Sequence, residues 1–361
     1  MIAFTADNHV GVTSQWSMKE RRDDFLKGFR EVVDGALASG ARSLIIGGDL
    51  FNTTTPQGFA VAFVKREIDR LAGFGCTAYG IDGNHDISGG SWLRVCGITP
   101  LDDVPAVVSH TPKVTACGIG YRKSDDVLAA INSMADRGVK CDILVLHLAL
   151  GELNRMGATS DIAGAEVSKS LHEMGVRLVL MGHIHIRQSV VVDGITFAYC
   201  GSTEMCSMNE PRDKSFELVD PATMALTRVP IATRKIEHAV IGTEEEFSRF
   251  EAGLEKCTDV LQSVFVSSML VDGVKRLRDL AKARECLMRI QVVHPEGEAK
   301  EPAFDRSTGV TGLEQAISLS FAPDSAEAAF IKACIRSPET AAAMAEDIIT
   351  GKGKEGKEEG K

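Results

Sequence analysis

Gly182-His183-Ile184-His185 follows a mainly apolar run from Val176 to Met181, and this run predicts a buried strand. In an extended chain, side chains two positions apart face the same side, so both imidazoles are expected to leave the strand end toward one point. The N-terminus repeats this arrangement, because Ile2-Ala3-Phe4-Thr5-Ala6 runs directly into Asp7-Asn8-His9. Imidazole and carboxylate groups are common ligands of divalent metal ions. The two segments therefore predict a metal site at the ends of strands.

Three further segments place polar side chains after apolar strands. They are Gly47-Gly48-Asp49-Leu50-Phe51, Gly83-Asn84-His85-Asp86, and His147 after the predicted strand Asp142–Leu146. Asp-x-His alone is expected by chance about once in a chain of this size, and a lone histidine such as His147 is more often a satisfied core residue. Five such segments in this order favour a shared site and indicate a two-metal phosphoesterase centre. No role in it is expected for His110, His172, His238 and His294.

The composition is that of an ordinary globular protein, with 361 residues and 44% hydrophobic residues, which is enough for two domains. No stretch has the ~18 unbroken apolar residues that a membrane helix needs, and no signal peptide precedes the first strand, so we expect a cytoplasmic protein. Nine cysteines without CxxC pairing predict reduced thiols that serve as small core hydrophobes.

The net charge of −10 opposes a DNA-binding role, because most nucleic-acid binders present a basic face. A two-metal site would weaken this objection locally. Two divalent cations bring four positive charges, whereas Asp7 and Asp49 bring two negative ones and histidine binds in its neutral form, so the occupied site is about two units positive. The net charge still predicts weak, strongly salt-sensitive DNA binding by this chain alone.

Residues 1 to about 200 alternate strand-like runs with amphipathic stretches, which predicts an α/β fold with ligands at the strand ends. The expected helices are Lys19–Ala38, Gly58–Ala72 and Asp126–Ala135, and the expected strands among them are Ser43–Ile46, Thr77–Ile81 and Asp142–Leu146. From residue 189 the pattern changes to strand, turn and strand, with Asp193-Gly194 as a hairpin turn. The strands of that part are Ser189–Val192, Ile195–Tyr199, Ser215–Val219 and Ala225–Pro230.

A second unit is expected to begin near Thr233. Its predicted elements are a helix at Glu244–Leu254, a strand at Cys286–Val293, a loop at Glu296–Thr311 and a helix that ends at Cys334. A last helix carries an apolar stripe that consists of Ala341, Met344, Ala345, Ile348 and Ile349. The stripe could dock a partner or pack on the chain's own second unit. The tail 351–361 contains only Gly, Lys and Glu and is expected to be disordered.

Taken in order, Asp-x-His, Gly-Asp, Gly-Asn-His-Asp, His and Gly-His-x-His resemble the pattern of the calcineurin-like metallophosphoesterase superfamily. More narrowly, the chain resembles the SbcD family, the nuclease subunits of SbcCD-type double-strand-break repair complexes. This narrower resemblance covers about residues 1–230, and Asn52 departs from it, because several relatives have a phosphate-contacting histidine there. The residues that carry it are Asp7-Asn8-His9-Val10-Gly11, Gly48-Asp49-Leu50-Phe51-Asn52 and Tyr199-Cys200-Gly201-Ser202-Thr203-Glu204, followed by Ser207, Glu210 and Lys214–Val219.

The resemblance implies a fold and a domain plan. It implies a four-layer α/β/β/α metallophosphoesterase sandwich at 1–232 as the nuclease domain. It also implies a smaller α+β capping and DNA-binding domain at 233–335. Residues 336–361 would form a possible partner-binding helix and the disordered tail.

The resemblance also implies a centre of two divalent metal ions, most simply Mn²⁺. Asp49 would bridge them, because a carboxylate has two oxygens. One ion would be completed by Asp7, His9 and His185, and the other by Asn84, His147 and His183.

His85 follows a ligand directly, so we expect its side chain near the leaving oxygen of the phosphate, which it would protonate or orient. Asp86 is expected to hold a neighbouring backbone segment or histidine in place.

The activity that the resemblance implies is that of a DNA exonuclease and endonuclease. It would be a homodimer working with an SbcC-like coiled-coil ATPase in DNA repair or recombination. The alternatives are a stand-alone phosphodiesterase or phosphatase for small phosphoesters, and a metal-free scaffold, which would require lost ligands. The residues after the catalytic region and the Tyr199–Val219 pattern favour the nuclease. Lys275, Arg278 and Lys282 share one helical face that could contact DNA phosphates, although a solvated face is the more common outcome of such a pattern.

Overall fold

Strand β8 (Leu178–Gly182) carries the histidine pair at its carboxyl end and lies inside a six-stranded sheet of the order β5-β6-β7-β8-β10-β9. The computed structural model describes residues 1–293 except 16–17, 88–90, 154–161, 208–209 and 255–259. Within this sheet β6, β7, β8 and β10 are parallel, and β5 and β9 are antiparallel edges. The remaining strands are β5 (Ala106–His110), β6 (Lys113–Ile119), β7 (Ile143–His147), β9 (Gln188–Val192) and β10 (Ile195–Tyr199).

A second six-stranded sheet has the order β12-β11-β1-β2-β3-β4. Its first four strands in the chain are parallel. β11 pairs with β1, and β12 pairs with β11, both in antiparallel fashion. Both sheets thus direct the carboxyl ends of their parallel strands to one edge, where ligand sites of such sheets lie. The strands are β1 (Ile2–Thr5), β2 (Ser43–Gly47), β3 (Thr77–Ile81), β4 (Thr99–Pro100), β11 (Ser215–Val219) and β12 (Leu226–Pro230).

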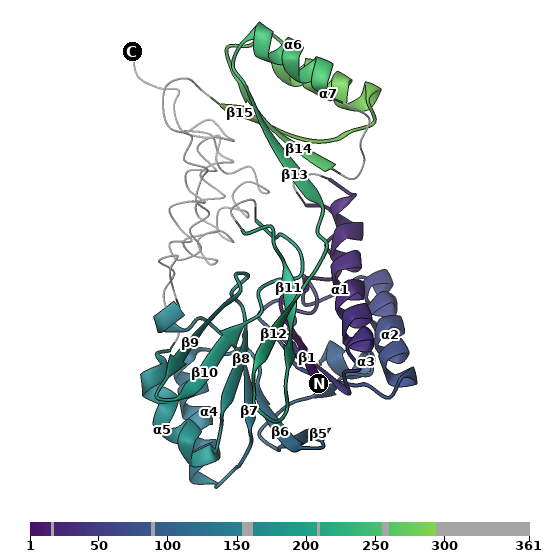
Figure 1. Cartoon of the computed structure of the whole chain (residues 1–361). Coiled ribbons are helices and arrows are strands. Elements are labelled where there is room, and N and C mark those ends of the chain that lie inside the picture. Colours follow the sequence, from purple (N-terminus) through teal and green to yellow (C-terminus); the bar gives the residue numbers. More distant parts are fainter. Residues whose placement is uncertain (16–17, 88–90, 154–161, 208–209, 255–259, 294–361) are drawn as a thin grey trace, which may run out of the picture. The chain divides into compact units, whose positions relative to one another are not determined.

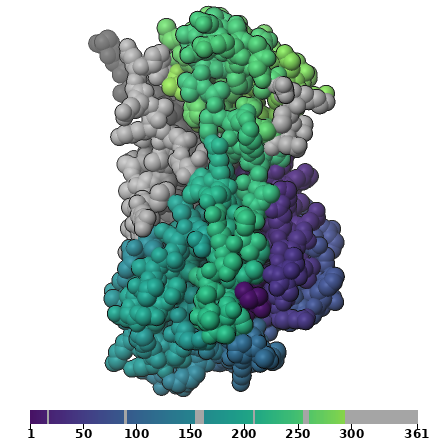
Figure 2. Space-filling view, in the orientation of Figure 1, coloured from purple at the N-terminus to yellow at the C-terminus, as the bar shows by residue number. Residues whose placement is uncertain are grey.

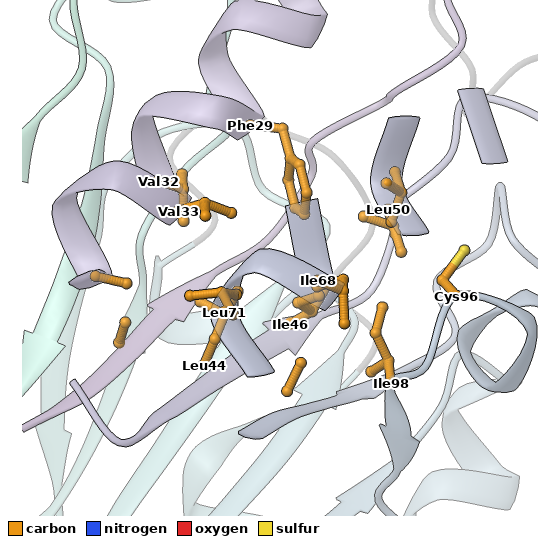
Figure 3. Close-up of a cluster of buried hydrophobic side chains, with 14 of the residues drawn as sticks. Phe29, Val32, Val33, Leu44, Ile46, Leu50, Ile68, Leu71, Cys96 and Ile98 are labelled. Atoms are coloured by element: carbon orange, nitrogen blue, oxygen red, sulfur yellow. The ribbon is translucent and has the colours of Figure 1, made fainter. Parts of the chain in front are cut away.

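Helices cover the outer face of each sheet. The helices α1 (Arg21–Ala38) and α2 (Gly58–Gly73), with the short α3 (Trp92–Val95), pack on the β1-β2-β3 sheet. Figure 3 shows this contact, with Phe29 of α1 and Ile68 of α2 above Leu44 and Ile46 of β2. The helices α4 (Ser124–Asp136) and α5 (Gly164–Met174) cover the other sheet. These two helix pairs lie on opposite flanks, purple and teal in Figures 1 and 2.

A third apolar cluster joins the two sheets face to face. It contains Phe4 and Ile45 from one sheet and Val145 and Leu180 from the other, and all four are fully buried. Side chains alternate along each strand, so the neighbouring positions point outward to the helices. This inner core fixes the spacing of the two sheets, and thereby of the strand ends that carry the predicted ligands.

A smaller parallel sheet of the order β13-β14-β15 follows in the chain. It contains β13 (Lys235–Ile241), β14 (Val260–Ser267) and β15 (Leu287–Val293), with α6 (Glu244–Gly253) and α7 (Gly273–Ala283) packed on it through their own apolar cluster. Thr243 caps α6 by accepting a hydrogen bond from the backbone N–H of Glu246. Residues 1–293 together form one compact unit.

The α/β prediction is confirmed in its coarse form, as two mixed sheets with helices and a small additional parallel sheet. The predicted helices and strands of the first 230 residues are present with shifted ends. The sequence prediction missed α3, β4, β5, β6, α5, β13 and β14. The predicted loop at Glu296–Thr311, the helix to Cys334, the apolar stripe at Ala341–Ile349 and the tail lie outside the described residues. No helix in the described part of the chain combines the length and the apolar character that crossing a membrane requires.

Candidate metal centre

The predicted ligands come together where the strand ends of the two sheets meet. His9 follows β1 and His185 follows β8, and their Nε2 atoms lie 3.2 Å apart. Asn84, after β3, places its amide oxygen 3.0 Å from His147 Nε2 and 3.0 Å from His183 Nδ1. Two groups of potential metal ligands are therefore present, one around His9 and His185 and one around Asn84.

Asp49 lies between these groups. Its Oδ2 is 3.9 Å from His9 Nε2 and 3.4 Å from His147 Nε2, so one carboxylate faces both. Asp7 belongs to the same cluster, because its ligand oxygen, one of Asp49 and a nitrogen of His147 all lie within 4.8 Å of one another. Asp7 also accepts hydrogen bonds from the backbone N–H of His183, at 2.9 and 3.1 Å. All seven predicted ligands meet in one place, and their ligation of a metal stays a prediction.

Three imidazoles are fixed through Nδ1. The Nδ1–H of His147 donates to the carbonyl of Gly47 at 2.8 Å, which also ties one sheet to the other. His185 Nδ1 pairs with Glu210 Oε1 at 2.9 Å, and His85 Nδ1 pairs with the carbonyl oxygen of Asn52 at 2.9 Å. When Nδ1 donates, the neutral ring presents the lone pair of Nε2, which is the form that binds a metal or accepts a proton. The Asn52 position thus contacts His85 through its backbone.

The backbone is strained at the site. Eight non-glycine residues of the described part have positive φ, and four of these are Asp7, His9, Asp49 and His183, with φ of 52°, 46°, 50° and 91°. Such conformations cost of order 1–3 kcal/mol each and concentrate at functional sites, where they aim a side chain. Here they turn the chain sharply after each strand, so that the side chain enters the centre.

Two glycines allow the segments to approach one another. A Cβ on Gly83 would clash with the backbone nitrogen and Oδ1 of Asp49, and a Cβ on Gly182 would clash with the carbonyl of Gly47. The residues on each side of the centre are therefore packed backbone against backbone. A side chain at either position would separate the ligand segments.

Asp86 performs the supporting role that the sequence predicts, and it does so for the backbone. Its carboxylate accepts hydrogen bonds from the N–H groups of Leu50, Phe51 and Gly83, at 2.9, 2.7 and 3.2 Å. Burial and the nearby Asp49 charge raise its pKa to about 7, against the lowering effect of these three donors. Asp86 thereby connects the segment after β2 to the segment after β3, which carry Asp49 and Asn84.

Electrostatics couple Asp49 to His147. Burial opposes the charge on Asp49, but the hydrogen bond and charge of His147 outweigh it and lower the pKa of Asp49. Burial likewise opposes the charge on His147, and Asp49 overcomes it and raises the pKa of His147 to about 9. Burial and the neighbouring His185 lower the pKa of His9 well below its usual value. A divalent cation at this position would replace the proton on His147, so metal binding releases a proton here.

Sequence reasoning gave no role to three residues at the site. The Glu210 carboxylate accepts hydrogen bonds from His185 and, at 2.6 Å, from Lys214 Nζ. Burial opposes the charge on Glu210, but these two partners outweigh it and lower its pKa to about 2. The Tyr121 ring lies 6.1 Å from that of His147 and 6.0 Å from that of His183. Cys206 lies beside His9 and His185. Glu210 belongs to the sequence motif on which the family resemblance rests, and that motif was the signal that could have revealed its role.

The remaining sequence predictions concern the cysteines, the histidines outside the site and three basic residues of α7. Five of the seven described cysteines are buried, as predicted, but Cys206 and Cys286 are only partly buried, so the prediction was wrong for them. The ligand groups among the described residues do not include His110, His172 or His238. His294 lies outside the described part. Lys275, Arg278 and Lys282 are all exposed on α7, which is compatible with a solvated face and with a contact to DNA phosphates.

The donor set fits a pair of divalent ions. It offers four imidazoles, two carboxylates and one amide oxygen, gathered at distances that small cations could span. Mixed nitrogen and oxygen donors suit first-row divalent metals and do not select one of them. His85 stands close enough to His9 and Asp49 for its ring nitrogen to belong to the same cluster.

Comparison with known proteins agrees with this geometry. The family model for calcineurin-like phosphoesterases matches residues 1–187, which is more than half of the chain. The chain belongs to this family. It is therefore a metallophosphoesterase by descent, with the ligand-bearing segments from Asp7 to His185 inside the matched region.

The chain is also distantly similar to archaeal repair proteins. It is 29% identical over 245 residues to the DNA double-strand break repair protein Mre11 of Haloferax volcanii, covering 64% of this chain and 52% of that protein. Its identity to the protein of the same name from Archaeoglobus fulgidus is 25% over 334 residues, covering 78% and 71%. The chain spans about half the length of the first of these relatives. Among solved structures, TT1561 of Thermus thermophilus has a TM-score of 0.45 at 12% identity, covering 64% of this chain and 98% of that one.

Replacing Gly83 with alanine should push Asp49 out of the centre, because the added Cβ has no room beside the Asp49 backbone and carboxylate. We expect a loss of metal affinity of about 10–100-fold, the range for disturbed support of a ligand. Calorimetric titration with Mn²⁺ measures it. The control is Gly73→Ala at the end of α2, where a Cβ meets nothing within 4 Å. Equal affinities of the two variants would contradict the packing argument.

Proposed function

We propose that the chain is a metal-dependent DNA nuclease, with exonuclease and endonuclease activity, that works in DNA repair or recombination. The observation that carries this proposal is the meeting of all seven predicted ligands and His85 at one edge of the two sheets, in a chain of the calcineurin-like phosphoesterase family. The choice of DNA over other phosphoesters is supported by the similarity to repair proteins of archaea.

The proposed centre holds two divalent ions, most simply Mn²⁺, with Asp49 as the bridge. Its Oδ2 faces His9 on one side and His147 on the other, which supports this role. Asp7, His9 and His185 would complete one ion. Asn84, His147 and His183 would complete the other, supported by the 3.0 Å distances of both imidazoles from the Asn84 amide oxygen.

Bound cations would acidify a water for attack on phosphorus and neutralise charge on the phosphate oxygens. The chain's own contribution to proton transfer is assigned to His85. Because its Nδ1 is engaged by the Asn52 carbonyl, Nε2 is the atom that remains for the leaving oxygen. In its imidazolium form, with a proton on each ring nitrogen, His85 would protonate or orient that oxygen through Nε2, as a general acid does. Its ring stands edge-on to His9 at 4.9 Å, close to the proposed ions.

The wider assignment follows the same proposal. On this proposal, residues 1–232 are the four-layer α/β/β/α nuclease domain and residues 233–335 belong to the smaller α+β capping domain. Residues 336–361, which lie outside the described part, would hold a partner-binding helix and the tail. The partners are DNA, a second copy of the chain and an SbcC-like coiled-coil ATPase, in the cytoplasm. Three apolar clusters support this order of layers. One joins α1 and α2 to the first sheet, one joins the two sheets, and one joins the second sheet to α4 and α5.

A paired substrate assay tests this function. The chain with Mn²⁺ should degrade double-stranded DNA, and adding the coiled-coil ATPase with ATP should increase the rate. The comparison substrate is bis-p-nitrophenyl phosphate, a small phosphodiester. Efficient hydrolysis of the small ester without DNA cleavage, with or without the ATPase, would reject the nuclease in favour of a stand-alone phosphodiesterase.

Asp49→Ala should lose both ions, because it removes the bridge, whereas His9→Ala should chiefly lose one. Metal analysis of the purified, metal-loaded variants measures the ion-to-protein ratio. Asp69→Ala is the control, because this carboxylate is exposed on α2 and forms an ion pair with the exposed Lys65, away from the centre. Two ions per chain in the Asp49→Ala protein would falsify the bridging assignment.

His85→Gln should retain both ions and DNA binding and lose turnover, by about 100-fold or more for a general acid. The glutamine side chain can still accept or donate a hydrogen bond but cannot deliver a proton at neutral pH. Single-turnover cleavage by the metal-replete variant is the measurement. Cleavage at nearly the wild-type rate would remove His85 from the reaction.

A further inference from the structure

Cys206 stands beside the centre without belonging to the predicted ligand set. Its Sγ and one ring nitrogen from each of His9 and His185 all lie within 4.8 Å of one another. The thiol also donates a long hydrogen bond to the carbonyl oxygen of Glu204, at 3.8 Å. Among the cysteines that the structure describes, Cys206 is the one that shares such a group with histidines.

The loop that carries Cys206 is fastened on several sides. Its carbonyl accepts from Gln15 Nε2 at 2.6 Å, and its N–H donates to Glu210 Oε2 at 3.2 Å. Just before it, the fully buried Arg21 donates to Glu204 Oε1 and to the carbonyl of Met205, at 3.1 and 2.9 Å. The sulfur is therefore held next to the histidines by a fixed backbone.

His9 contributes a buried imidazole to this group. Its side chain is 4% exposed, and its Nδ1 has no hydrogen-bond partner. Its Nε2 faces His185 Nε2 at 3.2 Å, although His185 already has Glu210 as a partner for Nδ1. Buried imidazole nitrogens that face each other in this way, next to a thiol, make a cluster of nitrogen and sulfur donors.

We propose that Cys206 is a third ligand, with His9 and His185, for a thiophilic divalent cation such as Zn²⁺ or Cd²⁺. Zinc favours four-coordinate sites of histidine and cysteine, with bonds of about 2.0–2.1 Å to nitrogen and about 2.3 Å to sulfur. A carboxylate or water would take the fourth position. Binding transfers the thiol proton to solvent and leaves a thiolate on the metal.

This inference rests on the proposed metal centre and adds a selectivity to it. Hard ions such as Mn²⁺ prefer oxygen donors, whereas thiolate selects zinc and related ions. The same half of the centre would therefore hold Mn²⁺ through Asp7, His9 and His185, and Zn²⁺ with the additional sulfur. Zn²⁺ would then occupy the position of one Mn²⁺ and inhibit manganese-dependent hydrolysis.

Titration of the metal-free full chain with Cd²⁺ tests the sulfur ligand directly, because thiolate bound to Cd²⁺ gives a charge-transfer absorption in the ultraviolet. The band expected for the wild-type protein should be lost in Cys206→Ser and weakened in His9→Ala. Cys286→Ser is the matched control, since Cys286 is the other partly exposed cysteine of the described part, and it should keep the band. An equal band in Cys206→Ser and wild type, or none in wild type, overturns the proposal.

Competition between ions separates ligation from a structural role. In Cys206→Ser the ratio of Zn²⁺ affinity to Mn²⁺ affinity should fall at least about tenfold, whereas a merely loosened loop would lower both affinities together and contradict the inference. The proposed function is judged independently by Mn²⁺ binding to the wild-type chain. If Mn²⁺ fails to bind there, the two-metal centre is rejected; if it binds and the cadmium band is missing, only the role of Cys206 is rejected.

Discussion

The close approach of backbone segments around Asp49 is the constraint on which the rest of the centre depends. The segment after β2 carries Asp49, the segment after β3 carries Asn84, and Asp86 joins them by accepting three backbone N–H groups. Gly83 lies so close to the backbone nitrogen and carboxylate of Asp49 that there is no room for a Cβ between them. Because this contact is made by backbone groups and the buried Asp86 carboxylate, the chain itself holds the two segments together. Binding then costs little rearrangement.

Assembling such a site destabilises the fold locally. Burial raises the pKa of Asp7, and four ligand residues have strained backbone conformations. The cost is offset by the apolar clusters on both faces of each sheet, which hold the strand ends in place. In the chain alone, Asp49 and His147 compensate each other as an ion pair. A divalent cation would take over that compensation, which is why binding should stabilise the folded state.

The sequence predicted which side chains gather at the strand ends better than it predicted the helices and strands, and the reason is physical. Each ligand follows a short apolar strand, and parallel strands bring their carboxyl ends to one edge. The strands β5 and β6 were missed because Ala106–His110 and Lys113–Ile119 mix polar and apolar residues, which weakens their periodicity. Cys206 was missed because it lies in a loop after β10, and no spacing rule connects it to His9. Its position depends on long-range contacts, such as that of Arg21 with the same loop, which sequence patterns do not reveal.

The charge distribution suggests that bound cations would attract the substrate in addition to supporting its hydrolysis. Near the centre, Arg187, Lys214 and Arg228 are each paired with a carboxylate, from Glu217, Glu210 and Asp213 respectively. Their charge is thus largely compensated, and the whole chain carries a net charge of −10. A phosphodiester approaching this surface would be attracted chiefly by bound divalent ions. If the chain acts on DNA as proposed, stable DNA binding would need further contacts from elsewhere, and a partner could supply them.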